Sequence, residues 1–424
     1  MKLKNYFNKI FKSWWFILLI LGVVLRLVLM PITLHVDLWG HSFSAYFLAY
    51  EGRLNIYETL VSLPSSHPLV RNFGVADIFI YPPLTYYTLG FFKLLMRPFS
   101  DASFIPWLMS NLDKIYTYPG LLREIFLSKL PYLFLDVALA FFLAGLFKEE
   151  RLKKISFALW MFNPLALYAT FMVGQLDILP VFFVVLSLYF FRRKPYLAAF
   201  FLGIGGAYKM FPLLFILPLA FVVGKTFFER FKLVVIGFLP FFLSILPFIN
   251  SSAFRSMVLF SPKSQKMLFM GWNLSGAEVV YPFILFLMFF YFLAWFYPKR
   301  WSISNYFIAI LLLIFSVTHY HPQWFLWVTP FLIYDLVKNK FKNLVLVLTL
   351  FVCWLIITLL FEPSLSLSLF NPIFPELNKA VGLSEILSKY TDVFQLKSLI
   401  RSVFAATSLF YIFRLFKSPL KDDV

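Results

Sequence analysis

The sequence predicts an all-α, polytopic integral membrane protein, folded as a single module over residues 1–424 with about twelve transmembrane helices. Three observations lead to this prediction. Only 14% of the residues are charged and 61% are hydrophobic, whereas soluble domains average about 25% charged residues. Apolar stretches of roughly 17–25 residues, long enough to cross a ~30 Å hydrocarbon core, recur along the chain. The net charge of +18 lies mainly in short loops between these stretches, which indicates membrane orientation rather than nucleic-acid binding.

The first apolar stretch follows Lys2, Lys4, Lys9 and Lys12. It is longer than the apolar core of a cleaved signal peptide and lacks a cleavage site of small residues, so it is predicted to remain as the first span. The remaining spans follow in order along the chain. The predicted spans are 13–34, 127–147, 154–172, 177–191, 195–208, 211–223, 231–249, 277–297, 302–318, 323–337, 343–361 and 398–416.

The loops on one side of the predicted membrane are strongly basic. Together with the adjoining residues, they hold 22 of the 38 lysines and arginines. Because positive charge is retained on the cytoplasmic side, both termini are predicted to be cytoplasmic. The number of crossings then requires residues 81–97 to lie in the outer interface, within a long outer first loop of residues 35–126 that carries interfacial helices. It also requires a tight outer turn at residues 208–210. The basic loops are 1–12, 148–153, 192–194, 224–230, 298–301, 338–342 and the tail after 416.

Two opposite charges lie well inside predicted spans. At ~1.5 Å per residue, Arg26 lies about 12 Å and Asp136 about 14 Å from the outer ends of their helices. A lone charge at this depth costs at least ~2.5–3.5 kcal/mol. The shared depth therefore predicts a structural ion pair between Arg26 and Asp136.

The predicted outer loops contain all five histidines and several short polar motifs. The motif that follows the first span carries Asp37, flanked by His35 and Trp39. A carboxylate in this position is a polar residue in the turn that ends the first helix, a surface acid that reaches toward the interface, or a general base that deprotonates a hydroxyl group at the membrane surface. The motifs are HVDLWGH (35–41), YPPL (81–84), GQLD (174–177) and HYHPQW (319–324).

Asp177 and Lys209 each allow two interpretations. Asp177 opens the fourth predicted span after Gly174 and Gln175, so it caps the helix, contacts a substrate, or does both. Lys209 lies between two short spans, where a cation either reaches toward the interface or binds a phosphate group.

His319 and His321 lie two residues apart at the outer end of a span, and Pro322 permits a new helix to begin. No third ligand accompanies them in the sequence, so hydrogen bonding to a phosphate or a sugar hydroxyl is favoured over metal binding. The single cysteine, Cys353, lies in an apolar stretch, which excludes disulfides within the chain and argues against a cysteine metal site. No metal or other cofactor is expected.

The ordered set of motifs resembles the GT-C superfamily of membrane glycosyltransferases, which use polyprenyl-phosphate-linked sugars. It is most similar to the dolichyl-phosphate-glucose-dependent enzymes and to the mannosyltransferase of GPI-anchor assembly with its prokaryotic relatives. Residues 325–424 match only in being hydrophobic. The segments that carry the resemblance are Asp37, EGRLNIYE (51–58), YPPL (81–84), LFLDVALAFF (133–142), NPLALY (163–168), GQLD (174–177), KMFPLLFILP (209–218) and the H-x-H turn (319–321).

The resemblance implies metal-independent, inverting transfer of a hexose, mannose or glucose, from the lipid donor to a glycan or glycolipid acceptor on the outer face of the membrane. Asp37 would be the general base. The donor phosphate would contact Lys209 with His319 or His321.

The resemblance also places four residues in the sugar or acceptor pocket. Many superfamily members carry a second acid close to the first, whereas histidines flank Asp37 here, which argues against a two-acid scheme. The pocket residues are Gln175, Asp177, His41 and Tyr81.

Three other functions remain open from the sequence. A transporter or flippase of lipid-linked sugars would also need an outer polar cluster, although such proteins often contain internal repeats, and none is evident. A glycan polymerase or ligase would use a polyprenyl-diphosphate donor, and the outer loops contain few arginines for it. A nonenzymatic structural membrane protein is the third possibility. Compact loops and short termini favour the plasma membrane of a prokaryote over the endoplasmic reticulum.

Overall fold

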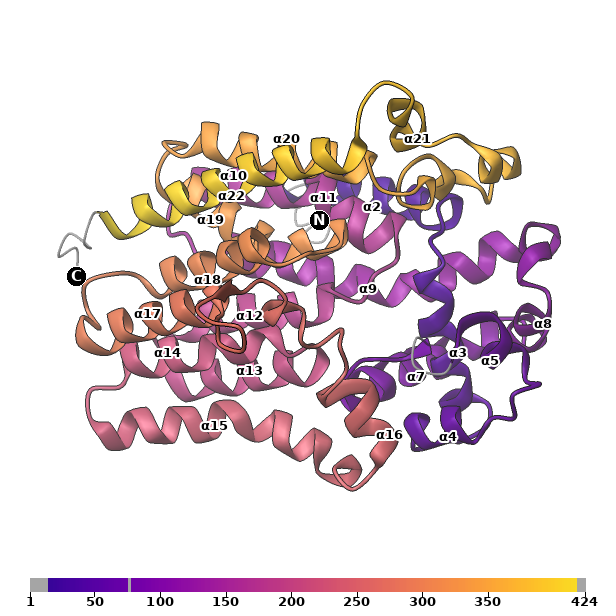
Figure 1. Ribbon diagram of the computed structural model, residues 1–424, viewed down its shortest axis with the longest axis horizontal. Helices are drawn as coiled ribbons and strands as arrows, with labels where there is room; N and C mark the ends of the chain where they lie inside the picture. Colours follow the sequence, from indigo (N-terminus) through magenta and orange to yellow (C-terminus); the bar gives the residue numbers. More distant parts are fainter. Residues whose placement is uncertain (1–13, 75–77, 418–424) are drawn as a thin grey trace, which may run out of the picture.

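The computed structural model describes residues 14–74 and 78–417, and nearly all of its regular structure is helical. The helices of residues 35–126, the predicted outer first loop, gather at one end of the molecule (Figure 1). They are short because turn residues interrupt the segment repeatedly. Their bounds are α3 (Asp37–Ala49), α4 (Ile56–Ser62), α5 (Pro68–Phe73), α7 (Pro83–Met96), η1 (Arg97–Phe99), α8 (Phe104–Ser110) and η2 (Leu112–Thr117).

The longer apolar helices form the body of the molecule. Their bounds are α2 (Trp14–Ile32), α9 (Leu121–Ala144), α10 (Glu150–Met161), α11 (Pro164–Ala166), η3 (Leu167–Met172), α12 (Ile178–Phe190), α13 (Pro195–Tyr208), η4 (Phe211–Phe215), α14 (Ile216–Val223), α15 (Phe227–Ile245), η5 (Leu246–Phe248), α17 (Pro282–Phe296), α18 (Ile303–Val317), η8 (Pro322–Trp327), α19 (Thr329–Lys338), α20 (Leu344–Leu359) and α22 (Val393–Lys417).

Short elements fill the remaining connections. A two-residue antiparallel hairpin pairs Trp272 with Val280 and Asn273 with Val279. The span predicted at 277–297 therefore begins later than expected, because its first residues belong to this hairpin. The short elements are α16 (Ser252–Phe254), η6 (Arg255–Leu259), η7 (Lys266–Leu268), β1 (Trp272–Asn273), β2 (Val279–Val280), η9 (Pro363–Leu365), η10 (Leu367–Phe370), η11 (Pro375–Lys379) and α21 (Leu383–Ser388).

Five helical segments of the described chain are long and apolar enough to cross a membrane. Six further apolar helices of 10–17 residues are shorter than this. Each predicted span coincides over most of its described length with helix, so the all-α membrane fold is supported, while the count of twelve crossings stays a prediction. Residues 1–12 and the end of the C-terminal tail, both predicted to be cytoplasmic, lie largely outside the described residues. The five segments are Trp14–Ile32, Leu121–Ala144, Glu150–Met172, Phe227–Phe248 and Val393–Lys417.

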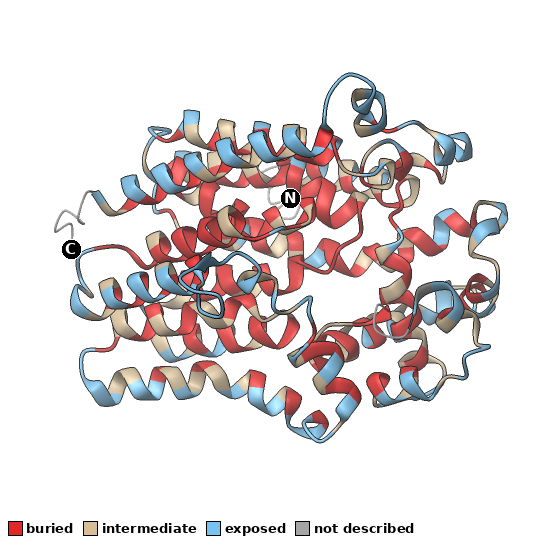
Figure 2. Ribbon diagram, viewed as in Figure 1, coloured by how far each residue is buried: buried red, intermediate tan, exposed pale blue. Residues whose placement is uncertain are grey.

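Exposed and half-exposed residues recur along the outer helices of the bundle (Figure 2), and many of them are large and apolar. On α15, Phe228 and Phe242 are each more than half exposed, and Ile17 and Leu21 on α2 are equally exposed. Exposure of these large apolar side chains to water would be unfavourable. Lipid chains would cover them without cost, in agreement with the composition.

The span predicted at 154–172 is a broken helix. Helix α10 ends at Met161, and the side chain of Asn163 accepts hydrogen bonds from the backbone N–H groups of Leu165 and Ala166. Pro164 lacks an N–H group and disfavours helical geometry in the residue before it. The chain therefore restarts as α11 and continues into the π-helical η3, which leads to the GQLD motif.

The segment 195–223 is divided where the sequence predicts a turn. Lys209 has extended backbone angles, and it separates α13 from η4. Helix α13 also packs closely on α15, because a Cβ atom on Gly203 would lie only 2.1 Å from the carbonyl oxygen of Gly237. Small residues at such crossings let two helix backbones approach.

The Arg26 guanidinium and the Asp136 carboxylate are in contact inside the bundle. Arg26 Nε lies 2.6 Å from Asp136 Oδ2, and both side chains are fully buried. Arg26 also donates to the carbonyl oxygens of Gly22 and Met161, while the Trp160 indole donates to Asp136. The pair therefore ties α2, α9 and α10 together.

The two ends of the bundle differ in composition. Helices α3 to α8 lie at one end, whereas the connections from α14 to α15 and from α17 to α18 lie at the other (Figure 1). Those two connections include the basic segments 224–230 and 298–301. Helix α7, which covers most of residues 81–97, packs on α3, α9, α13 and α15. Helices α3 to α8, predicted to lie on the outer side, and these basic connections thus occupy opposite ends.

Candidate functional site

A cavity of about 430 Å³ lies where α3, η4 and η8 approach the loop at residues 258–267. It brings together side chains that are far apart in the sequence. Six of the eight residues predicted for catalysis, phosphate binding or the sugar pocket line it. These are Asp37, His41, Tyr81, Gln175, Lys209 and His321.

Asp37 is the first residue of α3, and its side chain is 40% exposed. The interpretation of Asp37 as a residue that ends the first helix is wrong, because α2 ends at Ile32. The Gln175 amide donates a hydrogen bond to Asp37 Oδ2. The backbone N–H of Asp37 donates to His35 Nδ1 at 3.3 Å. Asp37 is therefore oriented on one side and open to the cavity on the other.

The geometry of the GQLD motif depends on its glycine. Gly174 has a φ of +80°, a conformation that other residues rarely adopt. A Cβ atom on Gly174 would also lie 3.1 Å from both Leu38 and Lys129. This turn ends η3 and directs the Gln175 side chain toward Asp37.

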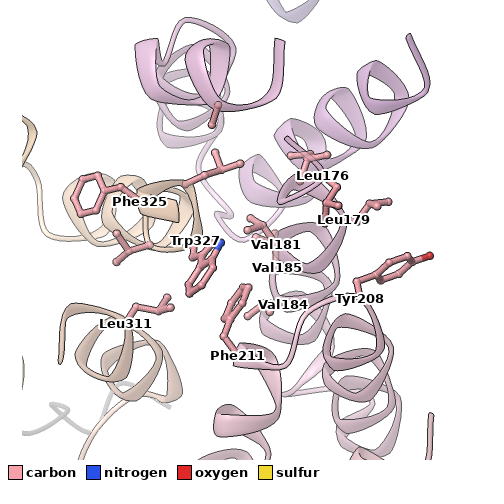
Figure 3. Packing of buried hydrophobic residues seen from close by; sticks show 14 of the residues in the cluster. Leu176, Leu179, Val181, Val184, Val185, Tyr208, Phe211, Leu311, Phe325 and Trp327 are labelled. Carbon is pink, nitrogen blue, oxygen red and sulfur yellow. The ribbon is translucent and has the colours of Figure 1, made fainter. Parts of the chain in front are cut away.

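Lys209 and Asp177 form an ion pair at the edge of the cavity. Lys209 Nζ lies 2.6 Å from Asp177 Oδ1, and their side chains are 15% and 0% exposed. The Trp327 indole donates to the same carboxylate oxygen at 2.8 Å. Figure 3 shows the Trp327 ring against Phe211, with its nitrogen toward α12.

This arrangement bears on the interpretation of both residues. Asp177 occupies the N-cap position of α12, as predicted, but within the described chain its side chain makes no capping hydrogen bond. Lys209 does not reach out to the interface either. Its ammonium group lies about 5 Å from the ring centres of Trp324 and Trp327 and 5.6 Å from that of Tyr81.

A second cation, Lys266, lies beside His321 at the wall of the cavity. Lys266 Nζ lies 3.5 Å from His321 Nε2 and 5.1 Å from the ring centre of Trp324. Burial, reinforced by the Lys266 charge, lowers the pKa of His321 to about 4. Burial also lowers the pKa of His41 to about 4. Both imidazoles are neutral at pH 7, so each has one N–H donor and one acceptor nitrogen.

His319 does not share this position. Among the described residues that line the cavity, only His321 comes from the H-x-H turn. The exposed His319 ring lies 5.9 Å from the His321 ring and 6.1 Å from that of Phe361. In the described part of the chain, no three His, Cys, Asp or Glu side chains are grouped to hold a metal ion.

Sequence reasoning missed Lys129, which is fully buried in α9. Its ammonium nitrogen, with three N–H donors, lies within hydrogen-bonding distance of four carbonyl oxygens, those of Thr33 (2.5 Å), Phe171 (2.8 Å), Met172 (3.0 Å) and Met30 (3.1 Å). These oxygens belong to the C-terminal parts of α2 and η3, where carbonyl groups lack partners and the helix dipole is negative. Lys129 therefore links the end of α2, which precedes Asp37, with the end of η3, which precedes Gln175.

The signals for the missed residues were present but ambiguous. Lys129 lies near the predicted outer end of its span, where a lysine ordinarily reaches the interface. Lys266 belongs to the predicted outer loop sequence SPKSQKM (261–267), and no sequence pattern links this loop to His321.

Comparison with known proteins adds no relative to this description. No protein-family model matches the chain, and no curated protein matches it. The chemical capacity of the site therefore follows from its geometry. It combines an oriented, accessible carboxylate with cations and neutral imidazoles across one cavity, which suits a proton acceptor facing an anionic leaving group.

Proposed function

We propose that the chain is a membrane glycosyltransferase that moves a hexose, mannose or glucose, from a polyprenyl-phosphate donor to a glycan or glycolipid acceptor. The observation that carries the proposal is the shared cavity of Asp37, Lys209, Lys266 and His321. The motif resemblance supports it independently. Reaction on the outer face of a prokaryotic plasma membrane agrees with the placement of the basic loops.

Asp37 acts as the general base in this proposal. Its carboxylate removes the proton from the acceptor hydroxyl as the oxygen attacks the anomeric carbon. The hydrogen bond from Gln175 fixes Oδ2, which reduces the number of orientations of the base. Holding the two reactants together can be worth about 7–11 kcal/mol of the barrier.

The phosphate leaves toward the cationic side. Lys266 and the His321 imidazole stabilise the negative charge that develops on the phosphate oxygen, so no acid is required to protonate it. Lys209 contributes less charge than an unpaired lysine, because Asp177 already neutralises it. Attack from the side opposite the phosphate inverts the anomeric configuration.

The polyprenyl chain would extend over apolar surface that lipid already covers. A cavity lined by both aromatic and charged side chains suits the polar head of such a donor. Transport of the same lipid would not require a base at Asp37. The polymerase or ligase alternative requires a diphosphate donor.

The test is transfer by the purified protein in nanodiscs with labelled polyprenyl-phosphate-mannose or polyprenyl-phosphate-glucose. Asp37→Asn should retain the fold and abolish release of polyprenyl phosphate from the productive donor. Glu51→Gln, which alters an exposed carboxylate of the same outer loop, is the matched control and should behave as wild type. Near-normal turnover by Asp37→Asn, or release only from a diphosphate-linked donor, would contradict the proposal.

A further inference from the structure

Three buried polar atoms on the wall of the cavity have no hydrogen-bond partner within the described residues. They are His41 Nδ1, Thr318 Oγ1 and Gln323 Oε1. The three residues are 4%, 5% and 3% exposed. Buried polar atoms are nearly always paired in folded proteins, so a group of exceptions around one cavity requires an explanation.

We propose that His41, Thr318 and Gln323 form a subsite that binds the hydroxyl groups of a hexose, a proposal that rests on the function proposed above. Gln323 Oε1 can only accept a hydrogen bond, so it selects a hydroxyl that donates. Thr318 Oγ1 both donates and accepts. A sugar ring carries several hydroxyl groups close together and matches this mixed set.

Aromatic rings complete the subsite. Trp324 and Trp327 both line the cavity, and their rings stack on each other with centres 5.1 Å apart. The ring of Tyr81 lies 5.5 Å from that of His41. An aromatic wall covers the apolar C–H face of a sugar, while polar atoms pair with its hydroxyl groups.

The local fold holds Thr318 and Gln323 in place. Thr318 follows the last residue of α18, and Gln323 lies in the first turn of η8. The Trp354 indole donates to the carbonyl oxygen of Pro322 at 2.9 Å, which fixes the chain immediately before Gln323. The two residues therefore flank the H-x-H turn that supplies His321, and the subsite lies beside the proposed phosphate contacts.

Apolar substitutions at Gln323 and Thr318 distinguish a role in ligand binding from a role in protein stability. Gln323→Leu and Thr318→Val remove atoms that have no partner, so neither should lower the unfolding temperature of the protein. Each should lower kcat/KM for the hexose donor about 10–100-fold. Thr170→Val is the matched control, because Thr170 Oγ1 is also buried and unpartnered among the described residues, but Thr170 does not line the cavity. It should leave kcat/KM unchanged.

Deoxy donors identify the hydroxyl groups that the subsite binds. Against a donor that lacks the hydroxyl contacted by Gln323, wild type and Gln323→Leu should have the same kcat/KM. The same loss by Gln323→Leu with every deoxy donor would overturn the subsite. A fall in the unfolding temperature of Gln323→Leu would also overturn it, because the side chain would then have a structural role.

Binding to a short-chain polyprenyl phosphate, with and without the hexose, tests the subsite without turnover. Wild type should bind the hexose-linked lipid more tightly than the bare phosphate, and Gln323→Leu should lose that preference. Absence of transfer together with this preference would contradict the proposed reaction and leave the subsite supported. Equal binding of the two lipids by wild type would overturn the subsite itself.

Discussion

Lys209 and Asp177 are 32 positions apart in the sequence, yet their charged groups form a 2.6 Å ion pair that the Trp327 indole also joins. The carboxylate is fully buried, whereas the lysine side chain retains 15% exposure beside the cavity. Removing Lys209 should therefore lower the free energy of unfolding more than removing Asp177.

Lys209→Met should destabilise the protein by about 3–5 kcal/mol, because it leaves the Asp177 carboxylate buried without its cation. Asp177→Leu should cost less, since Lys209 can turn toward the cavity. The double variant should be more stable than Lys209→Met alone. Equilibrium denaturation in detergent measures all three, and equal costs for the two single variants would contradict this asymmetry.

Gln175→Met should lower kcat with little change in the KM for the donor. Gln175 acts through the orientation of Asp37, whereas the donor phosphate is bound across the cavity by Lys266 and His321. Steady-state kinetics with the productive donor measures both constants. A rise in donor KM at constant kcat would place Gln175 in direct contact with the donor instead.

Lys129→Met should reduce the kcat of the folded protein. The substitution leaves carbonyl groups unpaired but no buried countercharge, and it releases the segments that lead to Asp37 and Gln175. Arg26→Met is the control, because it leaves the buried Asp136 carboxylate without its cation, and neither Arg26 nor Asp136 lines the cavity.

The two variants should therefore show opposite patterns. Arg26→Met should lower the unfolding temperature more, and Lys129→Met should lower the turnover of folded protein more. Parallel losses of stability and turnover in both variants would show that Lys129 has only a structural role.

Stability should fall as the pH drops from about 6.5 toward 4. Burial lowers the pKa of His41 and of His321 to about 4, so in this range the unfolded chain binds protons that the folded chain does not. Each histidine can contribute a slope of up to about 1.4 kcal/mol per pH unit.

Unfolding temperatures measured across this pH range test the assignment. His321→Gln and His41→Gln should each flatten the fall in stability. An unchanged slope in both cavity variants would contradict the assignment to these two histidines.

Apolar periodicity and charge predicted the helical segments well, because each depends on local composition. The division of residues 195–223 at Lys209 is an example. The Asp177–Lys209 pair was not predicted, because each residue has a sufficient local explanation as a helix cap or an interfacial lysine. Lys129 was missed for the same reason, since its partners are backbone carbonyl oxygens that no sequence pattern marks.

The unpartnered atoms of Thr318 and Gln323 have a practical consequence for finding the natural ligand. A molecule that pairs them binds the folded chain alone, so mass action raises the unfolding temperature as its concentration increases. At one hundred times its dissociation constant, such a ligand adds about 2.7 kcal/mol. A panel of sugar-linked lipids can thus be ranked by heating the protein with each one, before any acceptor is known.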